Sequence, residues 1–127
     1  MLKCLMRKVK YTAVVLTPES RELLLTLFPP LEGYEPIAHH MTICMGGWNR
    51  PERIGEKICL QVVGFDCDSK VSAVKIMGGG DLSQNETPHV TISVNRRNGG
   101  KPVMSNDLNN WTKIHPFLIE GIIEEVC

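Results

Sequence analysis

Short runs of apolar and β-branched residues recur along the chain, separated by stretches rich in Gly, Pro and Asn. Alternation of apolar and polar positions is typical of strands, because successive side chains of a strand point to opposite faces. Tyr11 to Leu16 reads Tyr-Thr-Ala-Val-Val-Leu and predicts a first strand. Similar runs predict further strands at residues 40–45, 57–65, 71–77, 89–94 and 117–126.

One segment has helical periodicity instead. Apolar residues recur every three or four positions between Pro18 and Phe28, which predicts a helix with one apolar face. Thr17 can cap this helix, and Pro29 ends it. A short helical turn is predicted near residues 105–111. Several strands with one clear helix predict an α+β fold.

Composition limits the classes of protein to consider. The chain has 127 residues and 43% hydrophobic residues, which is typical of one folded domain covering residues 1–127. Fourteen Lys and Arg balance fourteen Asp and Glu, whereas proteins that coat long nucleic acids usually carry a basic excess. We therefore expect no long nucleic acid as a partner, and any nucleotide ligand should be small or short.

The cell compartment is predicted from the first residues and the cysteines. The first ten residues include four cations and form no apolar signal segment, and no membrane-spanning apolar run follows. Five cysteines without a C-x-x-C pair predict reduced thiols and no zinc knuckle. We expect a cytoplasmic protein with no membrane partner.

The most informative feature is a repeated motif. His40-Met-Thr42-Ile-Cys-Met and His89-Val-Thr91-Ile-Ser-Val share the pattern His-apolar-Thr-Ile-small-apolar. Strand alternation predicts that each His, its Thr and the following small residue share one face. The alternate apolar residues should point into the core, namely Met41, Ile43 and Met45 in the first motif and Val90, Ile92 and Val94 in the second. Each motif strand then offers an imidazole beside a hydroxyl.

These motifs resemble the signature of the two-histidine (2H) phosphoesterases, in which two H-x-T/S motifs lie on apolar strands. The family includes RNA ligase-like cyclic phosphodiesterases, the terminal domain of fungal tRNA ligases, and small viral members that destroy nucleotide defence signals. The segment Ser105–Trp111 and the following residues 117–121 also look like the tail of RNA-repair-like members. For a viral member, the compartment would be the host cytoplasm.

The resemblance implies a bilobed fold of two antiparallel sheets related by a pseudo-twofold axis, with helices outside. One motif from each lobe would face a central cleft. His40 and His89 would then act as general acid and base on a phosphodiester, in roles the sequence leaves unassigned. Thr42 and Thr91 would donate hydrogen bonds to the phosphate oxygens, and no metal or cofactor would be required.

Five further residues are candidates for binding substrate. Arg50 and Arg96 lie in loops that leave the motif strands, and a guanidinium binds phosphate through two parallel hydrogen bonds. Trp48 could stack on a base, and Tyr11 and Tyr34 could do so with weaker support.

Other sites are weaker candidates. The Gly-rich segment at residues 78–81 lacks the Lys and Ser or Thr of a phosphate-binding loop and predicts a flexible turn. Cys44 is predicted to be a packed thiol rather than a nucleophile. His39 should point away from His40 and therefore share no metal with it, and His115 lacks the motif.

The sequence and this resemblance together predict a metal-independent phosphodiesterase that hydrolyses a small nucleotide or oligonucleotide, with cyclic nucleotide messengers slightly favoured. The resemblance to small viral members extends these messengers to the cyclic oligonucleotide signals of anti-phage defence. The first alternative is a 2′,3′-cyclic phosphodiesterase that processes short RNA ends. The alternative from another class is a protein that sequesters a nucleotide without cleaving it.

Overall fold

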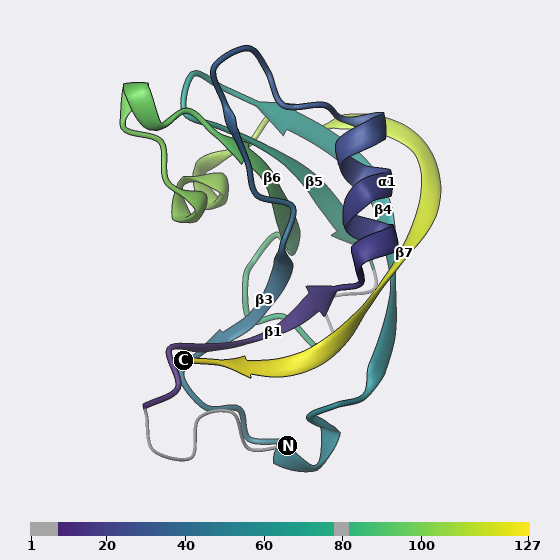
Figure 1. Ribbon diagram of the computed structural model, residues 1–127. Coiled ribbons are helices and arrows are strands. Elements are labelled where there is room, and N and C mark those ends of the chain that lie inside the picture. Colours follow the sequence, from purple (N-terminus) through teal and green to yellow (C-terminus); the bar gives the residue numbers. More distant parts are fainter. Residues whose placement is uncertain (1–7, 78–81) are drawn as a thin grey trace.

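The computed structural model describes residues 8–77 and 82–127 (Figure 1). Most predicted elements are confirmed. The short helical turn predicted near 105–111 is a 3-10 helix at 102–107, and the last strand begins five residues earlier than predicted. The predicted turn at 78–81 lies outside the described residues. The elements are β1 (Tyr11–Leu16), α1 (Pro18–Leu27), β2 (Glu35–Pro36), β3 (His40–Met45), η1 (Pro51–Arg53), β4 (Lys57–Cys67), β5 (Val71–Met77), β6 (His89–Val94), η3 (Arg96–Asn98), η4 (Pro102–Asp107) and β7 (Thr112–Val126).

The strands form one antiparallel sheet in the order β2-β6-β3-β1-β7-β4-β5. An additional pairing between β6 and β5 closes six of these strands into a barrel, with β2 as the extra strand. The structure thus agrees with the predicted α+β class in having mostly antiparallel strands and few helices. The pairings join the described strands in a single sheet and do not show two sheets related by a pseudo-twofold axis.

The barrel wall is unevenly paired. β4 and β7 are joined along most of their length, whereas β3 and β6 are joined by one residue pair, Met41 with Val90. Both residues are fully buried and belong to the main apolar core. The two motif strands therefore meet at the thinnest seam of the barrel.

Helix α1 begins as the sequence predicts. Its cap residue Thr17 accepts a hydrogen bond from the Ser20 backbone N–H at 3.2 Å. Leu24 is fully buried in the core, and Phe28 stacks on Phe65 of β4 with ring centroids 5.0 Å apart. These contacts hold α1 against β4 and β7 (Figure 1).

The cysteines depart from the prediction at one position. Cys44, Cys59 and Cys67 are free thiols, but Cys127 is disulfide-bonded. The prediction of reduced thiols is wrong for Cys127, because spacing along a chain does not determine which sulfurs meet in space. Within the described ranges, no helix has both the length and the apolar character needed to cross a bilayer.

Candidate active site

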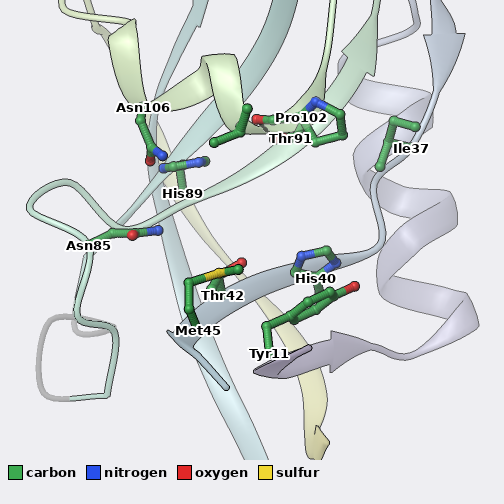
Figure 2. A pocket seen from close by; sticks show the side chains of 11 residues that line it. Tyr11, Ile37, His40, Thr42, Met45, Asn85, His89, Thr91, Pro102 and Asn106 are labelled. Carbon is green, nitrogen blue, oxygen red and sulfur yellow. Dashed lines mark hydrogen bonds between the residues drawn. The ribbon is translucent and has the colours of Figure 1, made fainter. Parts of the chain in front are cut away.

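A pocket of about 450 Å³ lies over the seam between β3 and β6. Figure 2 shows His40, Thr42 and Tyr11 on one side of this pocket, and His89 and Thr91 on the other. All four catalytic residues predicted from the sequence therefore line a single pocket. The remaining lining residues are Ile37, Met45, Asn85, Pro102, Val103 and Asn106.

The register of the seam explains how the two motifs face each other. In an antiparallel pair, residues on either side of one matched pair continue to oppose each other. Met41 is opposite Val90. If this register is continued by one residue on each side, His40 comes opposite Thr91, and Thr42 comes opposite His89. Each imidazole thus lies across the seam from the other motif's hydroxyl.

Both motif strands carry a β-bulge at the same position of the motif. The register against β1 skips Ile43, and the register against β5 skips Ile92, so each bulge follows the motif Thr. A bulge reverses the alternation of the residues that follow it. The repeat in the sequence therefore corresponds to a repeat in backbone geometry.

These bulges correct the predicted faces of the residues after each Thr. Cys44 and Ser93 were expected on the histidine face, but Cys44 joins the core and Ser93 is fully buried, bonded to the Ser72 hydroxyl at 2.6 Å. Met45 was expected in the core, but it is 76% exposed and lines the pocket. Val94 likewise leaves the main core for a second apolar cluster.

His40 is held by two other rings. Tyr11 stacks on it with centroids 4.8 Å apart, and the His39 Nδ1 lies 2.8 Å from the His40 Nδ1. The expectation that His39 points away is wrong, because His39 precedes β3 and the chain turns at Ala38, whose φ is 42°. Burial, followed by the neighbouring His39 and His89, lowers the pKa of His40 to about 4.

His89 is more enclosed, with 8% of its surface exposed. Its Nδ1 lies 2.8 Å from the Thr87 carbonyl oxygen, which can only accept, so Nδ1 carries a proton and donates it. The Nε2 atom is the one left to face the pocket. Burial lowers the pKa of His89, and the hydrogen bond to the Thr87 carbonyl opposes that shift.

The two threonines differ in how their hydroxyls are engaged. Thr91 Oγ1 lies 2.7 Å from the Ser105 hydroxyl and also donates toward the Pro102 carbonyl at 3.3 Å, which ties β6 to η4. For Thr42, no side-chain hydrogen bond is found within residues 8–77 and 82–127. The Thr42 hydroxyl is therefore available to a ligand.

Of the residues predicted to bind substrate, only Tyr11 reaches the pocket. Trp48 packs against the core, carries Arg53 over its ring at 5.9 Å and does not line the pocket. Arg50 is exposed just before η1 and does not line the pocket.

Arg96 forms an ion pair with Glu35 at 2.7 Å. The predicted substrate-binding roles of Trp48, Arg50 and Arg96 have no support in this geometry, and Tyr34, whose hydroxyl donates to the Asp68 carbonyl, lies elsewhere.

Sequence reasoning missed two polar residues. Asn85 and Asn106 flank His89 in the pocket (Figure 2), and their side-chain amides can both donate and accept hydrogen bonds. Both lie in loop or 3-10 segments with no motif of their own. Asn85 precedes His89 by only four residues, and this closeness was the one available signal.

Among residues 8–77 and 82–127, no group of three or more His, Cys, Asp or Glu side chains could hold a metal ion. The four catalytic candidates are instead arranged as two imidazoles and two hydroxyls around one space. Such a set can transfer protons and donate hydrogen bonds to an anion. No protein-family model matches the chain, and no curated protein matches its sequence.

Proposed function

We propose that this protein is a metal-independent phosphodiesterase of the 2H phosphoesterase type, acting on a small nucleotide or a cyclic oligonucleotide. The observation that carries the proposal is the pairing of His40 and His89 across one pocket, each beside a threonine of its own motif. Two imidazoles in one site can supply both proton transfers that phosphodiester cleavage needs.

The contacts of the two rings favour different roles. His40 is neutral at neutral pH because its pKa is about 4, and if its Nδ1–H donates to His39, its Nε2 is free to accept a proton. We assign His40 as the general base. The Thr87 carbonyl stabilises a positive charge on His89, so His89 is assigned as the general acid that protonates the leaving oxygen from Nε2.

The phosphate would be held by uncharged donors. The lining of this pocket contains no Lys or Arg among the described residues. The Thr42 hydroxyl and the amides of Asn85 and Asn106 can donate to the non-bridging oxygens, where charge must be stabilised in the transition state. Apolar residues Ile37, Met45 and Val103 offer surface for the ribose and base.

The two-lobed architecture of the family also belongs to this proposal. Each motif strand carries the same bulge after its Thr, and the two strands meet at a single residue pair. These shared features support a duplicated structural unit. Each copy contributes one motif strand, and the two strands pair within the same barrel.

A panel of 2′,3′-cyclic, 2′-5′-linked and 3′-5′-cyclic nucleotides, with products identified by mass, tests the activity. We expect turnover of at least one member. Preference for 2′,3′-cyclic ends would favour the RNA-processing alternative. Stoichiometric binding with no product from any member would instead establish the sequestering alternative.

The pH dependence of kcat/KM is expected to be bell-shaped with an acidic optimum. Activity should rise as pH increases through about 4, where His40 loses its proton, and fall as pH increases through the lowered pKa of His89. Since His39 helps to lower the pKa of His40, His39→Asn should move the acidic limb to higher pH. A flat profile between about pH 3 and 9 would remove both histidines from proton transfer.

A further inference from the structure

A second pocket of about 410 Å³ lies around Gly64, with Lys75, Trp111 and Lys113 in its lining. We call it the Trp111 pocket. We propose that it binds a second nucleotide of the substrate, with a phosphate between the two lysines and a base against the indole. This inference rests on the proposed function and extends it, because it makes the substrate an oligonucleotide of at least two units.

The barrel register brings the two lysines to either side of one glycine. Gly64 of β4 is opposite Lys75 of β5 on one side and opposite Lys113 of β7 on the other. Directly opposed residues of antiparallel strands point to the same face, so both lysine side chains leave the face on which Gly64 has no side chain. Neighbouring strands are about 4.8 Å apart, which places the two lysine backbones about 10 Å from each other.

Gly64 leaves the floor of this pocket open. A Cβ built at this position would lie 3.3 Å from the Thr112 carbonyl oxygen, 3.4 Å from the Lys75 Cβ and 3.8 Å from the Trp111 Cβ. Any larger side chain would occupy the space between the lysines and the indole. The glycine thus creates a recess that a flat ring and an anion can enter together.

The two lysines have no opposite charge beside them in the described lining of this pocket. Within residues 8–77 and 82–127, neither Lys75 nor Lys113 forms an ion pair, and the described lining contains no carboxylate. By contrast, Lys57 pairs with Glu120 at 2.6 Å on the same sheet. Two free ammonium groups beside an indole are suited to a nucleotide, since lysines bind its phosphate and every base can stack on an aromatic face.

The Trp111 pocket lies beside the candidate active site. Lys75, which lines the Trp111 pocket, is the register partner of His89, which lines the candidate active site. Pro88, the residue before His89, also lines the Trp111 pocket. Opposed residues in such a ladder have Cα atoms about 5 Å apart. A substrate held by His89 can therefore extend its neighbouring nucleotide over Lys75 toward Trp111.

Kinetics with two substrates test this subsite. We expect Lys75→Gln/Lys113→Gln to raise KM for a cyclic dinucleotide at least tenfold while kcat changes less than twofold, and to leave KM for a 2′,3′-cyclic mononucleotide unchanged. Lys8→Gln, at an exposed site, is the matched control. An equal rise in KM for both substrates, or no rise for the dinucleotide, would overturn the proposal. Lys113 is exposed, so Lys113→Gln alone provides the test if the double variant melts early.

Tryptophan fluorescence tests the subsite without any turnover. The chain has two tryptophans, so Trp48→Phe reports on Trp111 alone and Trp111→Phe reports on Trp48 alone. Adding the cyclic dinucleotide to protein that also carries His89→Asn should quench the first variant and not the second. Quenching in these variants, together with no cleavage of the dinucleotide by protein that retains His89, would support the subsite while refuting the proposed hydrolysis. Absence of quenching in Trp48→Phe would refute the subsite whether or not hydrolysis occurs.

Discussion

Replacing either pocket histidine by asparagine should lower kcat by about 10²- to 10⁴-fold, the usual contribution of a general acid or base. Asparagine is the informative substitution because its amide can take the place of Nδ1 and delete Nε2. His89→Asn can keep the bond to the Thr87 carbonyl, and His40→Asn can keep the contact with His39. The variants therefore remove proton transfer while retaining the local hydrogen bonds.

His115→Asn is the matched control for these variants, since His115 is exposed and does not line the pocket. It should keep full activity. Thermal melts should show that His40→Asn and His89→Asn remain folded, because both rings lie at the pocket surface rather than in the apolar core. Retention of more than a tenth of wild-type kcat by a folded His89→Asn would refute its role as the acid.

Thr42→Val should lower kcat by about tenfold to a thousandfold, as loss of a donor to transition-state charge does, with a smaller change in KM. Its hydroxyl has no partner within the described residues and is free to meet a phosphate. Thr91→Val should act differently. It leaves the Ser105 hydroxyl, 1% exposed, without its partner, which costs about 1–3 kcal/mol of folding free energy.

Serine at each position separates the two roles, because it restores the hydroxyl without the methyl group. Thr42→Ser should recover kcat, and Thr91→Ser should recover the melting temperature. Equal losses of kcat in Thr42→Val and Thr91→Val, with no change in stability, would mean that both hydroxyls serve the phosphate alike. Unchanged kcat in Thr42→Val would restrict the site to the two histidines.

Strand alternation and the repeated motif predicted most of the fold and the centre of the site. They located the motif strands at residues 40–45 and 89–94 with the bounds that the structure has, and they selected four residues that line one pocket. Strand position and the face of each side chain depend on neighbouring residues, so an alternating sequence pattern is enough to predict them. The closure of the barrel was not predictable in this way, because the β5–β6 pairing depends on contacts between segments rather than on either sequence alone.

Backbone irregularities account for the errors. Alternation placed Met45 in the core, but the bulge at Ile43 reverses the faces beyond it, and nothing in the sequence marks that bulge. The turn at Ala38 brings His39 against His40, where a regular strand would separate them. The predicted substrate-binding roles of Arg96 and Trp48 stay untested; in the structure Arg96 pairs with Glu35, and Trp48 packs against the core.

The two-imidazole mechanism is tested most directly by product formation in the presence of EDTA, measured by mass for wild-type protein and the His40→Asn/His89→Asn double variant side by side. The nucleotide panel supplies the substrates. Wild-type protein should convert at least one member at an undiminished rate in EDTA, and the double variant should form no product above the uncatalysed background. Loss of wild-type turnover in EDTA with recovery on adding Zn²⁺ or Mn²⁺, or equal turnover by the double variant, would contradict acid and base catalysis by His40 and His89.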